Sequence, residues 1–327
     1  MIPRLHFAHL PTPIESLPRL TKALGGPRLL VKRDDQTGLA FGGNKTRKLE
    51  FLVADAQAQG ARTLITAGAV QSNHCRQTAA AAARFGFDCA LVLTGDKPNQ
   101  VSGNLLLDAL CGAQFVWAEK SQREAVLQQT FEQAQQQGCK PYLIPYGGSN
   151  EIGARGYVYA MEELMKQIDS WCLGDARSLD WIVFASSSGG TQAGLALGAR
   201  LFSYKGKILG ISVDEPGQVL QERVAKLASE TAEGLGKRFE FSPAELLVNA
   251  DYNAAGYGVL TEAEREAIRL FARYEGLLLD PVYTGRAAAG MIDLIRKGFF
   301  KKDETVLFWH TGGTTALFAE KYSQNLL

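Results

Sequence analysis

This sequence of 327 residues has almost no net charge, few cysteines and no long apolar run. Its 35 lysines and arginines nearly balance 34 acidic residues, which gives a formal net charge of +1. Such a balance provides no electrostatic footprint for nucleic acid. No apolar run is long enough to cross a bilayer, and the N-terminal residues lack the apolar core of a signal peptide. We therefore expect no nucleic-acid or membrane partner and a cytoplasmic location.

The cysteines exclude a disulfide framework. They are Cys75, Cys89, Cys111, Cys139 and Cys172, an odd and scattered set that contains no C-x-x-C pair. That pattern is typical of reduced thiols and argues against a zinc site. We expect no metal centre.

Short apolar segments alternate with helical patterns along most of the chain. Residues 29–35 are expected to be a short strand that runs into a charged turn. Further strands are expected at residues 63–66, 89–93, 114–117, 141–145, 181–185, 208–213 and 306–309. Helices are expected between them, and residues 147–150 are expected to be a flexible break. Repeated strand–helix units with short apolar strands predict parallel sheets covered on both faces. The chain begins irregularly, residues 236–260 carry no clear pattern, and the length suits one large domain or two ordinary ones.

The clearest candidate for chemistry is Lys45, in the sequence Gly-Gly-Asn-Lys-Thr-Arg-Lys-Leu-Glu at residues 42–50. Apolar residues at helical spacing follow it and end before Gly60. Lys45 is therefore expected at a helix N-terminus, where positive partial charge disfavours an ammonium and favours use of the lysine as an amine. Taken alone, the segment fits a solvated lysine better, because surface lysines are common.

A second candidate is the Ser/Gly/Thr loop at residues 187–194, which follows a buried strand and opens a helix. Such a loop makes a backbone cup for a phosphate. It lacks the Gly-Lys-Ser/Thr ending of a nucleotide loop and the spacing of a dinucleotide fingerprint. The alternative is a small-residue turn that only lets helix and strand pack closely.

Two further segments follow strands at the same expected sheet edge. Gln-Ser-Asn-His at residues 71–74 places Ser72, Asn73 and His74 where ligands bind in parallel sheets, although Ser72 or Asn73 can equally be an N-cap and His74 a structural histidine. Thr311 ends the last strand. A Ser–His hydrolase pair is conceivable from residue types, but Ser72 lies in no G-x-S-x-G elbow.

Two tyrosines lie in loops beside glycines. Tyr257 and Tyr283 can stack on a ring or transfer protons there, but either one taken alone is better explained as a packed aromatic.

Taken together, five motifs resemble one known family. They are residues 42–50, Gln-Ser-Asn-His at 71–74, Ser-Gly-Gly-Thr-Gln-Ala-Gly at 188–194, Asp-Pro-Val-Tyr-Thr-Gly at 280–285 and His-Thr-Gly-Gly at 310–313. In this order they resemble the D-cysteine desulfhydrase and 1-aminocyclopropane-1-carboxylate (ACC) deaminase family. These are pyridoxal 5'-phosphate (PLP) enzymes with the α/β tryptophan synthase β-like fold, also called PLP fold type II. The resemblance covers nearly the whole chain.

The resemblance implies roles at the matching positions. Lys45 would hold PLP as a Schiff base. The phosphate would be bound by Ser188, Gly189, Gly190 and Thr191, with Lys48 as a helper. Asn73 would bond the ring hydroxyl, and Ser72 would meet the substrate carboxylate or transfer a proton. Tyr283 would be a candidate acid or base beside the ring, with Tyr257 close by, and His74 and Thr284 are expected near the substrate.

Two positions favour the desulfhydrase subgroup. ACC deaminases carry a glutamate after the tyrosine that matches Tyr283 and a leucine at the position of Thr311, whereas this chain has Thr284 and Thr311. A neutral threonine supports protonation of the cofactor's ring nitrogen less than a glutamate does, which suits loss of a thiolate better than opening of a cyclopropane. The predicted function is α,β-elimination of D-cysteine to pyruvate, sulfide and ammonia. The alternatives are ACC or L-cysteate as substrate, a phosphate-ligand binding protein without turnover, and a Ser72 hydrolase.

The resemblance also implies two domains and a homodimer. Residues 1–47 and 158–327 would form a large PLP-binding domain, and residues 48–157 a small inserted α/β domain, with PLP in the cleft between them.

Overall fold

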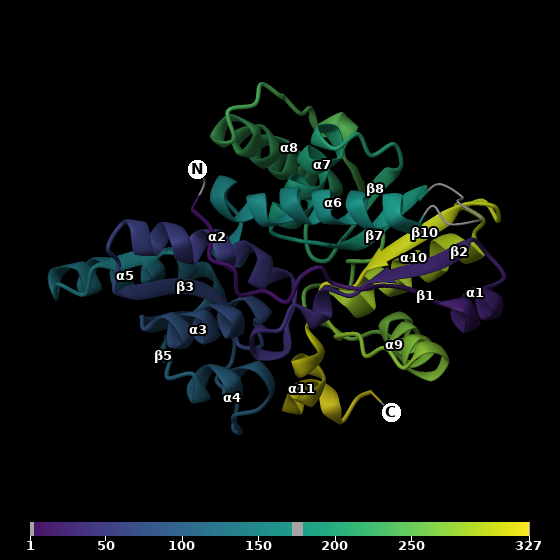
Figure 1. The fold of residues 1–327 in the computed structure, drawn as a ribbon. Coiled ribbons are helices and arrows are strands. Elements are labelled where there is room, and N and C mark those ends of the chain that lie inside the picture. The colour runs from purple at the N-terminus through teal and green to yellow at the C-terminus, as the bar shows by residue number, and fades with distance from the viewer. Residues whose placement is uncertain (1–2, 172–178, 327) are drawn as a thin grey trace.

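The computed structural model describes residues 3–171 and 179–326, so Cys172 lies outside the described residues. The described part contains two sheets (Figure 1). The smaller is wholly parallel, in the order β5-β4-β3-β6, and its strands are β3 (Thr63–Ala69), β4 (Asp88–Thr94), β5 (Gln114–Ala118) and β6 (Pro141–Leu143).

The larger sheet has the order β1-β2-β10-β7-β8-β9, and only β1 runs antiparallel to its neighbour. Its strands are β1 (Ile14–Ser16), β2 (Arg28–Lys32), β7 (Trp181–Ser186), β8 (Lys207–Ser212), β9 (Leu247–Asn249) and β10 (Thr305–Trp309). Both ends of the chain therefore contribute to it, whereas the smaller sheet comes from one continuous stretch.

Helices cover both faces of each sheet, as the apolar strands predict. They are α1 (Pro18–Leu24), α2 (Asn44–Ala58), α3 (Asn73–Phe85), α4 (Gly103–Leu110), α5 (Arg123–Gln136), α6 (Glu151–Trp171), α7 (Gly190–Leu201), α8 (Gly217–Gly234), α9 (Glu262–Glu275), α10 (Thr284–Arg296) and α11 (Glu320–Ser323). In the larger sheet, Val183 of β7 packs toward α9 and α10, whereas Ile182 and Phe184 pack toward α6 and α7. This alternation is the period of two that a strand imposes.

The helix α6 joins the two sheets. Figure 1 shows it lying over both, against α2 on one side and α7 on the other. The approach to α2 is close, because a Cβ atom on Gly156 would lie 2.4 Å from the carbonyl oxygen of Arg47. The predicted domain boundaries at residues 48 and 157 both fall inside this helix pair, and the division into those two domains remains a prediction.

Some short elements differ from the sequence expectations. The short strand and charged turn expected at 29–35 are present as β2, which ends at Lys32, and the 3₁₀ helix Asp34–Gln36, but the full burial of Asp34 in that turn was not predicted. The segments β1, α1 and β9 carry no clear sequence pattern, because each is at most seven residues long. No helix among the described residues combines the length and hydropathy that crossing a membrane requires.

Candidate active site

A pocket lies where the loops after several parallel strands meet. These loops follow the carboxyl ends of β3, β6, β7 and β10, the edge at which open α/β sheets bind ligands. The pocket is lined by Asn44, Lys45, Ser72, Asn73, His74, Tyr146, Gly147, Ala185, Ser186, Ser187, Ser188, Gly189, Thr191, Tyr283, Thr311 and Gly312. Nine of the thirteen predicted site residues are therefore brought together here, and Lys48, Gly190, Tyr257 and Thr284 stand outside the lining.

Lys45 is the second residue of α2, and its side chain reaches into this pocket. Gly43 precedes the helix with a φ of +124°, a conformation that glycine adopts without strain. The Lys45 Nζ donates to the carbonyl oxygen of Gly147 at 3.2 Å. Burial lowers the pKa of Lys45 to about 8, because the charged form loses its hydration there. A neutral amine is thus accessible near neutral pH, and the solvated-lysine alternative is wrong for this position.

Lys48 lies one helical turn further along α2 and is buried. Its Nζ donates to the same Gly147 carbonyl at 3.2 Å and to Ser149 Oγ at 3.1 Å. Burial lowers the pKa of Lys48 well below its ordinary value, and the charge of Lys45 lowers it further. Two neighbouring lysines with a single carbonyl between them make a site that gains by receiving an anion.

The Ser/Gly/Thr loop supplies the rest of an anion cradle. Gly189 has a φ of +88° and precedes α7, whose N-terminal N–H groups face the loop. Ser188 Oγ lies 2.8 Å from Ser149 Oγ. A Cβ atom on Gly190 would lie 2.6 Å from Ser149 Oγ and 2.9 Å from Lys48 Nζ, so only glycine leaves this space open. Hydroxyls, free N–H groups and two lysines are the groups that hold a phosphate.

The segment after β3 lines the opposite side of the pocket. Ser72 is the N-cap of α3, and its Oγ accepts from Cys75 N at 3.2 Å. Asn73 is fixed by Asn104, whose Nδ2 donates to the Asn73 Oδ1 at 2.9 Å. The amide nitrogen of Asn73 lies next to Gly313, since a Cβ atom there would be 2.7 Å from it.

His74 does not form a hydrolase pair with Ser72. Its Nε2 lies 2.9 Å from Thr66 Oγ1, and its Nδ1 has no partner among the described residues. Burial, followed by the charges of Lys45 and Lys48, lowers the pKa of His74 well below its ordinary value. His74 is therefore a neutral histidine in the wall of the pocket.

The two tyrosines form a pair. The hydroxyls of Tyr257 and Tyr283 lie 2.6 Å apart, and the rings meet edge to face. Only Tyr283 lines the pocket. Burial raises the pKa of both well above the ordinary value, so both hydroxyls stay protonated at neutral pH. Tyr257 therefore touches the pocket only through its contact with Tyr283.

Asp280 holds Tyr283 in place. Its Oδ2 accepts from Val282 N and Tyr283 N, each at 2.9 Å, and its Oδ1 accepts from Thr284 N and Thr284 Oγ1, each at 2.7 Å. The carboxylate thus caps the start of α10. Thr284 is fully buried and bonded to this cap, so the structure places it beneath the pocket wall, whereas Thr311 lines the pocket itself.

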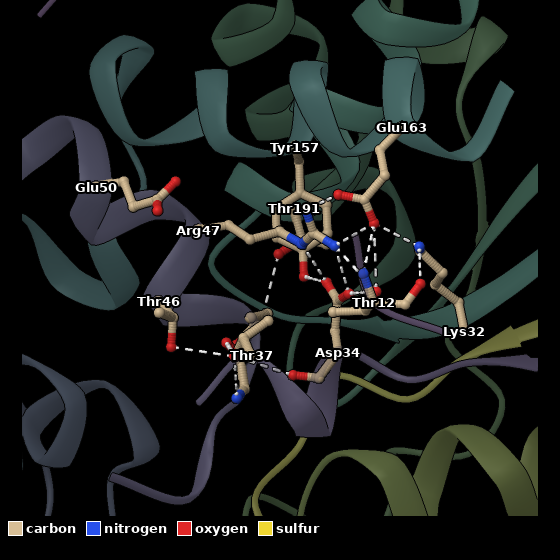
Figure 2. Close-up of polar contacts among 12 residues, drawn as sticks. Thr12, Lys32, Asp34, Thr37, Thr46, Arg47, Glu50, Tyr157, Glu163 and Thr191 are labelled. Atoms are coloured by element: carbon tan, nitrogen blue, oxygen red, sulfur yellow. Dashed lines mark hydrogen bonds and ion pairs between the residues drawn. The ribbon is translucent and has the colours of Figure 1, made fainter. Parts of the chain in front are cut away.

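A buried ion network anchors α2 (Figure 2). Arg47 donates to Asp34 from Nε and Nη2, each at 2.8 Å, and to Glu163 of α6 at 2.9 and 3.0 Å. Lys32 joins Glu163, and Tyr157 donates to Asp34 at 2.6 Å. The charge of Arg47 holds the pKa of Asp34 down at about 2, against the opposing effect of burial. The network ties β2, α2 and α6 together two residues from Lys45.

Seven residues of the pocket lining are not among the predicted site residues, and Asn44, Tyr146 and Gly147 are three of them. Asn44 donates to Thr191 Oγ1 at 3.1 Å and so links the lysine helix to the glycine loop. Tyr146 and Gly147 follow β6, and Gly147 begins the segment 147–150 that the sequence predicts to be a flexible break. The expectation of a mere break is wrong, because Gly147 provides the acceptor for both lysines. The sequence signal that could have identified this segment is the glycine pair at residues 147–148, directly after an expected strand.

The fold and this site define a class of α/β enzyme that holds a phosphate-bearing cofactor next to a buried lysine. Comparison with known proteins agrees. Residues 5–312 match the family described as "Pyridoxal-phosphate dependent enzyme", and the chain belongs to that family. A crystal structure described as that of an ACC deaminase homologue is 39% identical, covers 99% of this chain and is covered over 95% of its own length, with a TM-score of 0.88. The predicted fold class and the resemblance are confirmed.

The cofactor is therefore PLP, and the residues present fit it. The cradle that a Cβ on Gly190 would fill has the donors that a phosphate needs. Lys45 is the amine on the pocket wall. Among the described residues, no group of three His, Cys, Asp or Glu side chains is placed to hold a metal ion.

Proposed function

We propose that this protein eliminates sulfide from D-cysteine. In that reaction D-cysteine and water give pyruvate, hydrogen sulfide and ammonia. The bond between the β-carbon and sulfur breaks, sulfur leaves with its electron pair, and water replaces the nitrogen at the α-carbon. Family membership supports a PLP-dependent reaction of an amino acid, and the choice of D-cysteine is our own.

Bound PLP supplies an electron sink for the α-carbon of an amino acid. Ser188, Gly189, Gly190 and Thr191 would hold its phosphate with Lys48, and Asn73 would bond its ring. Lys45 would hold the cofactor through its amine, which burial keeps accessible in the neutral form. The protein then has to place the substrate and manage two protons.

Ser72 and Tyr283 are the residues proposed to act on the substrate. Both line the pocket across from the glycine loop, which puts the Ser72 hydroxyl and the α3 N-terminus where a carboxylate is stabilised. Lys45 is the amine on the pocket wall that would accept the α-proton. Tyr283 is protonated at neutral pH and is placed to donate to the leaving sulfur, with Tyr257 as its hydrogen-bond partner. His74 completes the wall as a neutral group.

One observation carries the substrate choice. Among the described residues, the pocket lining contains no aspartate or glutamate, and the position that carries leucine in ACC deaminases is Thr311 here. A neutral lining supports a protonated ring nitrogen less than a carboxylate would, so the electron sink is shallower. Loss of a thiolate from a β-carbon needs less of that sink than opening of a cyclopropane ring.

The rival substrate is ACC, because the similar crystal structure is described as an ACC deaminase homologue. ACC and water would give 2-oxobutanoate and ammonia. L-cysteate, with sulfite as its leaving group, is a third candidate on the same chemistry. A homodimer also remains a proposal, to be checked by sedimentation of the cofactor-loaded protein.

The test is a substrate panel. Purified protein loaded with PLP receives D-cysteine, L-cysteine, L-cysteate or ACC, and 2-oxo acid and sulfide are measured, with Lys45→Ala as the control. The proposal expects pyruvate and sulfide from D-cysteine and neither from the control. Turnover of ACC alone would move the assignment to the rival, and absence of both bound cofactor and turnover would favour a binding protein.

A further inference from the structure

A second cleft opens next to the cofactor pocket. Its volume is about 860 Å³, which leaves room for a small amino acid and water. Tyr146, Ser187 and Ser188 line both cavities, so the two share a wall. Tyr257, the outer member of the tyrosine pair, also lines the cleft. The cleft is therefore a route along which a substrate can reach Lys45.

The walls of the cleft carry opposite charges. Lys120 and Arg123, before and at the start of α5, lie on the wall from the smaller sheet. Asp214 and Glu215 follow β8 on the wall from the larger sheet. Glu215 is already paired with Arg223 at 2.7 Å, which also lines the cleft. Asp214 is thus the acidic group that remains to be matched.

Asp214 has an unsatisfied oxygen. Its Oδ1 is buried and accepts no hydrogen bond from the described residues. Burial raises the pKa of Asp214, while a hydrogen bond from Ser187 lowers it. A buried acceptor without a donor costs free energy that a bound donor restores, so an unsatisfied carboxylate oxygen in a cleft calls for a cationic ligand.

Arg123 offers the complementary charge. Its guanidinium stacks on the ring of Tyr146 at 4.5 Å from the ring centre, which fixes it at the junction of cleft and pocket. Its ion-pair partner, Glu124, is 73% exposed, so that pair is readily exchanged for a ligand. Lys120 is exposed on the same wall.

We propose that this cleft receives the amino-acid substrate on its way to Lys45. Asp214 accepts hydrogen bonds from the α-ammonium group, and Arg123, helped by Lys120, donates to the carboxylate. A free amino acid is a zwitterion and carries both charges that the two walls match. The inference rests on the proposed function only in taking the substrate to be an amino acid.

Rapid mixing of the PLP-loaded protein with D-alanine tests the inference. D-alanine has no leaving group on its β-carbon, so the change in cofactor absorbance reports arrival of the amino acid without elimination. We expect the second-order rate constant to fall about tenfold in Asp214→Asn and in Arg123→Gln, the loss typical of a hydrogen bond to a charged group. The limiting rate at saturation should stay unchanged. Asp96→Asn and Lys97→Gln are matched controls, because both residues are exposed and line a different cavity.

One-charge ligands separate the two walls. Propionate should slow the association of D-alanine less in Arg123→Gln than in the parent protein. In Asp214→Asn it should slow that association as much as in the parent protein. Ethylamine should slow the association of D-alanine less in Asp214→Asn than in the parent protein, and to the same extent in Arg123→Gln as in the parent protein. If Asp214→Asn disturbs folding, judged from circular dichroism, Arg123→Gln and Lys120→Gln carry the test.

Unchanged association rates in Asp214→Asn and Arg123→Gln would overturn the inference, as would equal losses in the two controls. Failure of the proposed function has a different signature. In that case D-cysteine releases no sulfide, while D-alanine still reacts with the cofactor and still reports on the cleft.

Discussion

Lys45 and Lys48 share one acceptor, the carbonyl oxygen of Gly147, which lies 3.2 Å from each Nζ. Two ammonium groups cannot both be well solvated by a single buried carbonyl. Burial lowers the pKa of both lysines, so two ammonium groups side by side are disfavoured here. An anion in the glycine loop would relieve that cost and favour the charged form of Lys48. The one-turn spacing of Lys45 and Lys48 on α2 thus places a reactive amine next to an anion site.

The pKa of Lys45 predicts how the apoprotein takes up its cofactor. Burial lowers this pKa to about 8, below the ordinary 10.5, so the reactive neutral form becomes the major form above about pH 8. The rate at which apoprotein regains yellow absorbance after addition of PLP should rise with pH and level off above about pH 8. A rate that still climbs tenfold per pH unit through pH 9.5 would indicate an ordinary exposed lysine.

The ion network under α2 predicts a large loss of stability in Arg47→Met. The substitution leaves Asp34 and Glu163 buried without their shared partner, which typically costs about 3–5 kcal/mol. Denaturant unfolding measures this loss. Arg296→Gln is the matched control, because its pair with Glu266 is about half exposed on both sides and should contribute less than about 1 kcal/mol. Equal losses in the two variants would contradict the account.

The same network predicts a pH dependence. The pKa of Asp34 is about 2 in the folded protein, whereas an aspartate without these neighbours has a pKa of 3.8. Folding therefore favours the ionised form. This contribution, roughly 2 kcal/mol, is present above about pH 4 and is lost as the pH falls toward 2. In Arg47→Met the loss of stability between pH 4 and pH 2 should be smaller than in the parent protein.

Asn104 is expected to position Asn73. It is fully buried, and its Nδ2 also donates to the Gln71 carbonyl at 2.8 Å. Asn104→Ala should leave the Asn73 side chain free to rotate and weaken PLP binding about tenfold, by loss of one oriented hydrogen bond. Titration of apoprotein with PLP checks this, with the half-buried Asn249 in β9 as the control position (Asn249→Ala). Unaltered affinity in Asn104→Ala would show that Asn73 needs no such support.

The tyrosine pair predicts unequal and coupled effects. Tyr283→Phe removes the hydroxyl that lines the pocket and should lower kcat about 10²-fold or more, the usual size of an acid–base contribution. Tyr257→Phe removes only its partner and should cost about tenfold, as loss of one hydrogen bond does. The double variant should be no slower than Tyr283→Phe, because the groups act as a unit. Independent, multiplying effects in the turnover assay would argue that Tyr257 acts directly on the substrate.

Much of the fold followed from local pattern, and much of the site did not. Alternating apolar strands and helices predicted parallel sheet covered on both faces, and strand-to-loop transitions pointed to Ser72, Ser188 and Thr311 at one edge. Partnerships between distant residues left no such pattern. Arg47 and Glu163 are separated by 116 positions, and their contact depends on how α2 packs on α6. Periodicity reports which face of an element is buried, not which buried groups meet.

The segment at 280–285 shows the same limit on a smaller scale. Its sequence marked a strand-to-helix turn, and Tyr283 lines the pocket as expected. The side-chain hydroxyl of Thr284 turned instead to the cap formed by Asp280, because a buried carboxylate at a helix start recruits the nearest donors. The substrate argument therefore rests on the absence of a carboxylate from the pocket lining of the described residues, and not on a contact made by Thr284 itself.

The central claim is that this pocket releases sulfide from D-cysteine, and the most direct measurement is a competition assay. PLP-loaded protein receives equal concentrations of D-cysteine and ACC, and sulfide, pyruvate and 2-oxobutanoate are followed together. The account predicts equal amounts of sulfide and pyruvate, little 2-oxobutanoate, and none of the three products with Lys45→Ala. A 2-oxobutanoate rate equal to or above the sulfide rate would contradict the claim and assign the neutral pocket to opening of the ring.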